Sequence, residues 1–263
     1  MKKLLLALTA VAAFTGSAVA EDLPARTYTK APAMVPTPSW TGFYLFGGGG
    51  YGLWDANNAS VVVPTGFGLS NTQKMGGDGY FGTVGGGYDW QFNAPVFNAA
   101  AVFGVFADGQ FGSIRGTIQD QAFLLSGRES DRTNWAVGAR VGLLVAPTVL
   151  SYVNGGYSGA NFSGATLANN FTGTAFSTTP SFTRNGWFAG GGVENQLNLF
   201  GSSPGWFMKT EYRVAEYGKA TLAESTLGGV VTPFGVTFSP IVQTVSTSLV
   251  YRFNWTGPVV AKY

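Results

Sequence analysis

Residues 206–214 read WFMKTEYRV, and two kinds of side chain alternate along this stretch. Odd positions 207–213 carry Phe, Lys, Glu and Arg, whereas even positions carry Trp, Met, Thr, Tyr and Val. A repeat of two residues predicts a β-strand with two unlike faces. Only 11% of the chain is charged, against about 25% in soluble domains, so the apolar face is expected to meet non-aqueous surroundings.

The same alternation extends over much of the chain. It predicts eight strands, each of roughly 10–15 residues, which is long enough for a tilted membrane strand. Their approximate ranges are 40–54, 79–92, 97–113, 133–145, 149–160, 185–197, 206–217 and 241–253. After the first twenty residues, no stretch is apolar for the ~18 residues that a spanning helix needs. We therefore expect an all-β, transmembrane β-barrel.

The gaps between these strands alternate in length. The short gaps contain turn residues, whereas the long gaps 55–78, 114–132, 161–184 and 218–240 are rich in Gly, Ser, Thr and Asn. This order predicts an eight-stranded antiparallel up-and-down meander with short periplasmic turns and long outer loops. The segment around Thr221–Pro240 is apolar for a surface loop. Three interpretations are open: it folds over the barrel mouth, extends the strands, or contacts a partner.

A soluble β-sandwich would also alternate, but its charges would face outward. Here the charges lie on the face with small and polar residues, and aromatic residues cluster at strand ends, as in the two girdles of membrane barrels. The predicted interfacial aromatics are Trp40, Trp54, Trp90, Trp135, Trp187, Trp206, Tyr251 and Phe253.

Charges predicted to face inward balance, with four of each sign. They are Asp89, Asp108, Arg140, Glu194, Lys209, Glu211, Arg213 and Arg252. Since an eight-stranded barrel is only wide enough to be filled by side chains, these residues are expected to form a salt-bridged plug. The alternative is a narrow pore lined by the same network. Glycine clusters in the strands are expected to relieve crowding and to leave room for long charged side chains.

The chain has no cysteine and no histidine, which excludes thiol nucleophiles, His-ligated metals and Ser-His-Asp triads. No catalytic, metal or cofactor site is expected, although a Ser/Asp/Tyr site acting on lipid is a formal alternative. Glu129 and Asp131 lie between Arg128 and Arg132 in a predicted loop, a pattern typical of a solvated loop tip or a strand-end ion pair.

The N-terminus is typical of a secretory signal peptide over residues 1–20, with cleavage near Ala20. Removal of Lys2 and Lys3 leaves 13 basic and 13 acidic residues, so no nucleic-acid partner is expected. Residues 21–39 are a Pro-rich periplasmic linker available for a periplasmic contact, 40–253 the barrel, and 254–263 a C-terminal tail.

Several segments resemble the small outer-membrane β-barrel proteins of alphaproteobacteria, the porin-like outer-membrane immunogenic protein family. They are SWTGFY at 39–44, GGYDWQ at 86–91, residues 134–142 and 152–159, GWFAGGGVE at 186–194, KTEYR at 209–213, EYG at 216–218 and LVYRF at 249–253. The resemblance implies an eight-stranded barrel in the outer membrane of a Gram-negative cell, embedded in lipid after insertion by the barrel-assembly machinery, with no catalytic residues or cofactor.

The sequence departs from the family pattern at two places. Phe106 stands two residues ahead of Asp108, where an inward acidic residue is common, and the chain continues past Phe253 to Tyr263. Either aromatic could serve as the terminal assembly signal. The predicted function is a structural and surface role in the cell envelope, as a surface antigen. The alternative is a narrow porin-like channel for small polar solutes or ions.

Overall fold

A computed structural model describes residues 39–95, 99–197 and 205–253. The chain in these ranges forms twelve strands of one antiparallel sheet. The strands are β1 (Gly42–Val62), β2 (Phe67–Gly68), β3 (Gln73–Ala94), β4 (Ala99–Asp120), β5 (Leu125–Ala146), β6 (Val149–Phe162), β7 (Thr166–Asn169), β8 (Ala175–Thr178), β9 (Phe182–Gln196), β10 (Trp206–Tyr217), β11 (Ala220–Thr226) and β12 (Val231–Arg252). The all-β antiparallel prediction is confirmed.

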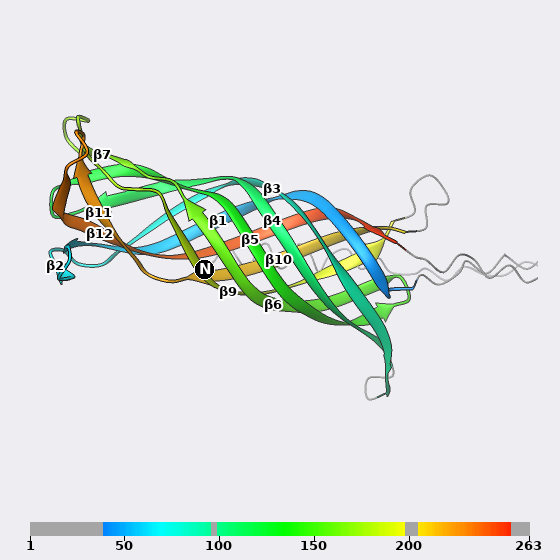
Figure 1. Cartoon of the computed structure of the whole chain (residues 1–263). Helices are drawn as coiled ribbons and strands as arrows, with labels where there is room; N and C mark the ends of the chain where they lie inside the picture. The colour runs from blue at the N-terminus through cyan, green and yellow to red at the C-terminus, as the bar shows by residue number, and fades with distance from the viewer. Residues whose placement is uncertain (1–38, 96–98, 198–204, 254–263) are drawn as a thin grey trace, which may run out of the picture. The chain divides into compact units, whose positions relative to one another are not determined.

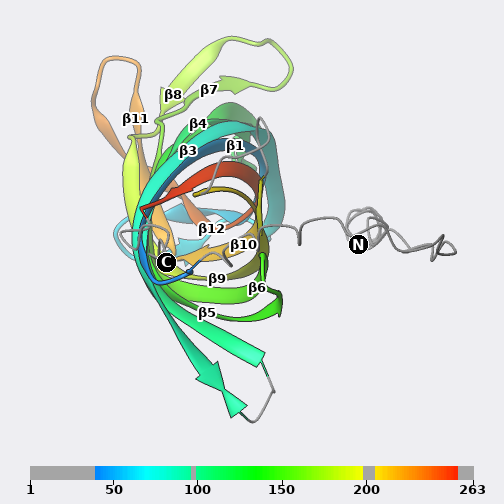
Figure 2. The ribbon, with the colours of Figure 1, turned by 90° about the vertical axis from the view of Figure 1, so that its right-hand side faces the viewer.

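Eight of these strands close into a ring, seen from the side in Figure 1 and along its length in Figure 2. The ring order is β1-β3-β4-β5-β6-β9-β10-β12, and β12 pairs back onto β1 from Tyr44↔Arg252 to Val62↔Phe234. Ring closure gives every one of these strands two hydrogen-bonded neighbours, which protects backbone groups that an open sheet would leave unpaired.

The two-residue period assigns the faces of the ring strands as the sequence predicts. In β10, Lys209, Glu211 and Arg213 are buried, whereas Met208 and Tyr212 are exposed. The opposite parity holds along β12, where the even-numbered residues from Val242 to Arg252 are buried and the odd-numbered ones are exposed, except the half-buried Gln243. Apolar side chains therefore cover the outside of the ring, and charged side chains fill its inside.

The predicted long loops are largely strand, which corrects the sequence-based boundaries. β1 continues to Val62 and β4 to Asp120, while β5 begins at Leu125 and β12 at Val231. Glycine, serine and asparagine make these stretches look like loops. Each is nevertheless held by a continuous antiparallel register with its neighbours, which local composition does not reveal. The apolar segment around 221–240 is also strand, so of its three interpretations the one that extends the strands agrees with the structure.

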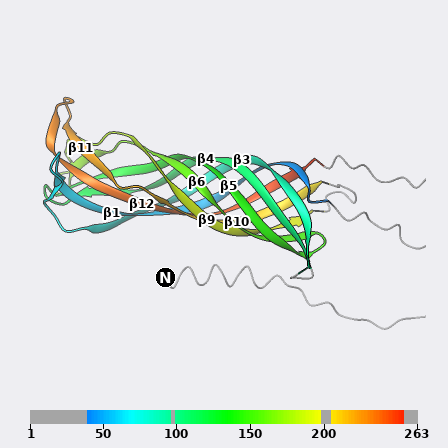
Figure 3. The same cartoon turned by 60° about the horizontal axis from the view of Figure 1, so that its bottom comes forward.

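The two ends of the ring differ (Figure 3). At the short-turn end, β3 ends at Ala94 and β4 begins at Ala99, β5 ends at Ala146 and β6 begins at Val149, and β9 ends at Gln196 and β10 begins at Trp206. The extended end carries β2, paired with the end of β1, and a flap made of β7, β8 and β11, which pairs with β5 and β12. Among the described residues, no helix has the length and apolar character needed to cross a membrane.

Glycine permits close approaches inside the ring. A Cβ added at Gly104 would collide with the carboxylate of Asp89, and one added at Gly192 would lie 2.8 Å from the hydroxyl of Tyr152. These two positions give room to inward polar side chains, as the sequence analysis expects of strand glycines.

Three predicted segments lie wholly or almost wholly outside the described residues: the signal peptide 1–20, the linker 21–39 except Ser39, and the tail 254–263.

Candidate functional site: the charged interior

All eight charges predicted to face inward do so, and each is at most 7% exposed. They form two groups along the interior. The four-residue square comprises Asp89, Arg140, Glu194 and Arg252, and lies toward the short-turn end. The upper cluster comprises Asp108, Lys209, Glu211 and Arg213, and lies farther along the ring.

In the four-residue square, each guanidinium bridges both carboxylates. Arg140 donates from Nε to Asp89 Oδ1 at 3.0 Å and from Nη1 to Glu194 Oε2 at 2.9 Å. Arg252 donates from Nη1 to Asp89 Oδ2 at 2.8 Å and from Nη2 to Glu194 Oε1 at 2.7 Å. The members come from β3, β5, β9 and β12, which are spread around the ring, so their side chains meet across its interior.

Aromatic rings enclose the square. The Cζ atom of Arg140 lies 4.4 Å from the centre of the Tyr44 ring, and that of Arg252 lies 4.5 Å from the Trp40 ring. The backbone carbonyl of Trp40 also accepts a hydrogen bond from Arg252 at 3.1 Å. Guanidinium groups stack well on aromatic faces, so these rings replace part of the hydration that the buried arginines lose.

The upper cluster centres on Arg213 and Glu211. Arg213 holds Asp108 through two hydrogen bonds of 3.0 and 2.7 Å, and donates to Glu211 at 2.8 Å. Lys209 Nζ lies 3.7 Å from Glu211. Glu211 Oε2 also accepts hydrogen bonds of 2.8 Å from Tyr152 and from Asn154. A two-pronged guanidinium–carboxylate pair is among the strongest arrangements available to buried charges.

Sequence reasoning missed several members of this interior. Tyr44, Tyr152 and Asn154 are buried beside the charges, and their strand parity is the signal that could have identified them. Phe106 is buried beside the upper cluster, from the same strand as Asp108. Its ring lies 5.7 Å from the Arg213 Cζ atom, so an aromatic face takes part in holding that guanidinium.

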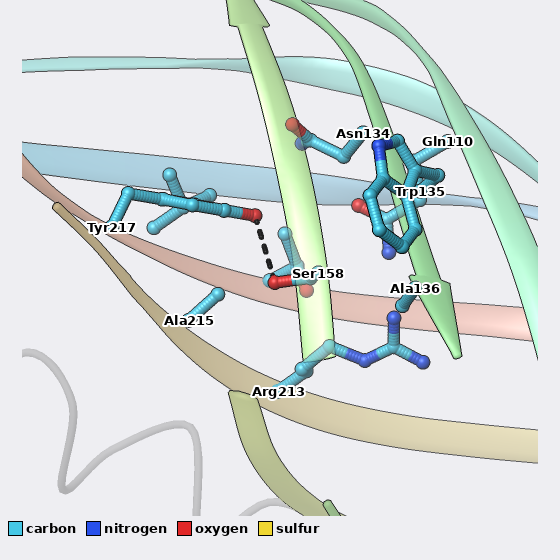
Figure 4. Close-up of a pocket in the computed structure, with 10 residues that line it drawn as sticks. Gln110, Asn134, Trp135, Ala136, Ser158, Arg213, Ala215 and Tyr217 are labelled. Atoms are coloured by element: carbon cyan, nitrogen blue, oxygen red, sulfur yellow. Dashed lines mark hydrogen bonds between the residues drawn. The ribbon is translucent and has the colours of Figure 1, made fainter. Parts of the chain in front are cut away.

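A small cavity lies beside the upper cluster, between Arg213, Tyr217 and Asn134 (Figure 4). Its volume is about 10 Å³, and its wall includes Ser158, whose hydroxyl lies 3.4 Å from that of Tyr217. A space of this size is close to the lower limit for one water molecule. Side chains therefore fill this part of the interior.

Two of the predicted interfacial aromatics face inward instead. Trp54 is 1% exposed, and its indole donates to the Ile114 carbonyl at 3.1 Å. Trp40 is fully buried, and its indole donates to the Pro147 carbonyl at 3.3 Å. Trp54 shares the inward parity of Tyr44 in β1, whereas Trp40 precedes the strand and packs on Phe207 at 4.9 Å between ring centres. The remaining predicted aromatics lie on the outer face, with at least partial exposure: Trp90, Trp135, Trp187, Trp206, Tyr251 and Phe253.

Glu129 and Asp131 are not in a solvated loop. They lie in β5 and point inward, at 0% and 2% exposure, while Arg128 and Arg132 point outward. In the described part of the chain, neither carboxylate has an ion-pair partner. Both residues lie beyond Trp135 toward the extended end. Burial raises the pKa of Glu129 to about 8 and that of Asp131 to about 6.

Across residues 39–95, 99–197 and 205–253, no group of three or more His, Cys, Asp or Glu side chains is arranged to hold a metal ion. The interior in these ranges contains two groups of paired charges and, toward the extended end, buried carboxylates without an ion-pair partner.

A closed antiparallel ring that exposes apolar side chains and buries a balanced charge network defines a class, the integral outer-membrane β-barrels. No protein-family model matches the sequence. The chain is 28% identical over 229 residues to the 31 kDa outer-membrane immunogenic protein of Brucella melitensis biotype 1, covering 85% of this chain and 90% of that protein. The protein of the same name from Brucella suis biovar 1 gives the same figures.

A solved structure supports the fold. The outer membrane protein OprG from Pseudomonas aeruginosa superposes with a TM-score of 0.54 at 12% identity, over 82% of this chain and 99% of that one. The resemblance to the outer-membrane immunogenic proteins is thus confirmed, and the protein is an outer-membrane component of the Gram-negative cell envelope.

Proposed function

We propose that the protein is an eight-stranded transmembrane barrel with a sealed centre, and that its role in the envelope is structural and surface-exposed rather than catalytic. The four-residue square carries the proposal, because its side chains join four well-separated strands across the interior. Such a crosslink both closes the lumen and stabilises the ring.

The difference between the two ends of the ring supports an orientation of the barrel in the membrane. The short-turn end resembles the periplasmic end of outer-membrane barrels, whereas the extended end with its flap resembles the outer, loop-bearing end. The domain plan of signal peptide, periplasmic linker, barrel and tail belongs to this proposal. So do membrane lipid as the surroundings of the barrel, the barrel-assembly machinery during insertion, and a periplasmic contact through residues 21–39.

The test is conductance of the purified full-length protein in planar lipid bilayers. We expect no steady conductance from the wild type. A charge-balanced double variant, Asp89→Ser with Arg140→Ser, removes one acid and one base from the square and should produce measurable conductance. The outward Val141→Ser variant, which truncates a side chain on the other face of β5, is the control and should stay closed.

The narrow-channel alternative makes the opposite prediction. Steady wild-type conductance that a bulky inward substitution such as Ser248→Trp abolishes would establish a pore and contradict the sealed centre. Ser248 is 1% exposed and faces the interior from β12, so the added ring would enter the lumen. Gel mobility before and after boiling shows for each variant whether the barrel has folded.

A further inference from the structure

Three arginines share a small area of the outer surface of β4 and β5. Arg115, Arg128 and Arg132 are all exposed, because their strand parity directs them away from the interior. Arg115 pairs in register with Ser130, so it lies diagonally between the other two. Diagonal neighbours in an antiparallel pair are about 7–8 Å apart, within reach of one another's long side chains.

The patch lies at the edge of the apolar outer face. The exposed Phe111 and Trp135 precede it on the short-turn side of β4 and β5, and their register partners are Thr133 and Gly109. Trp135 packs against Tyr157 with 5.9 Å between ring centres. Aromatic residues in this position mark the level of lipid headgroups, so the arginines are at or just beyond that level.

Acidic side chains do not neutralise the patch. None of the three arginines has a carboxylate within 4.0 Å among the described residues. The neighbouring Glu129 and Asp131 are buried on the opposite face of β5. Asp78 is opposite Arg115 in register, but its carboxylate accepts a hydrogen bond from the Tyr51 hydroxyl instead. The patch therefore keeps a net positive charge.

An apolar groove of about 510 Å³ runs farther down the same outer face. Its wall includes Val105 of β4 and Val137 of β5, and its floor is shallow at Gly86 and Gly87, which have no side chains. Most of the groove is lined by β1, β3 and β4, and it comes nearest to the arginine patch at Val137, on the same strand as Arg132. A ligand that fits both must have an anionic head and a hydrocarbon tail.

We propose that Arg115, Arg128 and Arg132 form a binding site for the phosphate group of a membrane lipid, whose acyl chain occupies the groove below. The guanidinium fork matches phosphate oxygens in geometry and charge. The inference rests on the transmembrane barrel proposed above, whose folding the gel-mobility measurement tests separately.

The experiment measures lipid selectivity in vesicles that contain the full-length protein. Electron spin resonance gives the association constants of spin-labelled phosphatidic acid and phosphatidylglycerol relative to spin-labelled phosphatidylcholine. We expect selectivity for the phosphate-bearing anionic lipids and a large loss of it in Arg128→Gln/Arg132→Gln. The upper bound of the loss is about thirty-fold, from about 1 kcal/mol per basic residue at an anionic surface.

The control is Lys219→Gln, which removes an exposed positive charge from the connection between β10 and β11, away from β4 and β5, and should keep the selectivity. Arg128→Lys/Arg132→Lys should lose part of it, since the charge remains but the fork does not. If the glutamine variant fails to fold, the lysine variant tests the site by itself. Equal losses in the glutamine variant and the control would overturn the site, as would full competition by inorganic phosphate, which would indicate a site for free phosphate.

Discussion

The buried carboxylates of Glu129 and Asp108 differ in whether they have an ion-pair partner. Asp108 is held by two hydrogen bonds from Arg213, whereas Glu129 is fully buried with neither side-chain oxygen hydrogen-bonded. A paired buried charge is tolerated, but an unpaired one favours its neutral form. Replacing Glu129 by a neutral residue should therefore stabilise the protein, whereas replacing Asp108 by a neutral residue should destabilise it.

Replacing Glu129 by Gln should stabilise the protein at neutral pH. The folded-state pKa is raised to about 8 from an ordinary value of 4.5, so the native state keeps a proton that the unfolded state releases. The free energy of unfolding should fall as pH rises from about 4.5 to about 8, by up to about 5 kcal/mol from this group. Urea titrations in lipid vesicles across this range should show that Glu129→Gln flattens the slope. The exposed Glu216→Gln should leave it unchanged, and an unaltered slope in Glu129→Gln would show that Glu129 is not the cause.

Removing one partner of the upper cluster should cost more than removing a matched pair. Asp108→Asn leaves Arg213 buried without its main carboxylate, and should cost about 3–5 kcal/mol of unfolding free energy. The double variant Asp108→Leu/Arg213→Met should cost less than that single change, because apolar side chains of similar volume replace both charges. Equal or additive costs in a double-mutant cycle would contradict a coupled pair.

At the scale of the element, the ring and the flap each contain a buried hydroxyl–carboxylate contact. Ser60 of β1 donates to Asp120 of β4 at 2.6 Å, and Ser177 of β8 donates to Glu224 of β11 at 2.7 Å. Burial and the nearby Asp120 carboxylate raise the pKa of Glu224 to about 7, although the bond from Ser177 lowers it. Two carboxylates that face each other repel when both are charged, so their contact is stable only while one of them is protonated.

The flap should consequently loosen as pH rises through about 7. Because the folded-state pKa is raised, the stabilisation is present at acidic pH and declines as Glu224 loses its proton. Hydrogen exchange in β8 and β11, corrected for the intrinsic effect of pH, should accelerate several-fold between pH 6 and pH 8. Glu224→Gln should remove this acceleration, while exchange in the paired middle of β12 should not change in either protein. Acceleration that persists in the variant would exclude Glu224 as the titrating group.

At the scale of the whole molecule, the closed ring separates a lipid-facing surface from a charged interior. Val141 lies in the part of β5 between the outward-facing Trp135 and the turn after Ala146, is 50% exposed, and is opposite Phe103 and Val153 on the neighbouring strands. Its substitution therefore tests the facing assignment of the entire ring rather than a local contact.

Val141→Arg should destabilise the lipid-embedded protein by about 2–4 kcal/mol, if residue 141 lies at the bilayer midplane. Val141→Leu, which keeps the apolar character, should cost less than 1.5 kcal/mol. Refolding titrations in vesicles measure both. Unaffected folding of the arginine variant would mean that this face does not contact hydrocarbon.

Strand parity let the sequence alone predict a transmembrane barrel and the inward direction of all eight interior charges, because alternation is a local property of each strand. The ring closure between β1 and β12, the bridging of four strands by Arg140 and Arg252, and the inward positions of Trp40, Trp54 and Glu129 were decided only by the tertiary structure. These features depend on register between segments up to about two hundred residues apart in the chain, and no local pattern specifies which partner a side chain will meet.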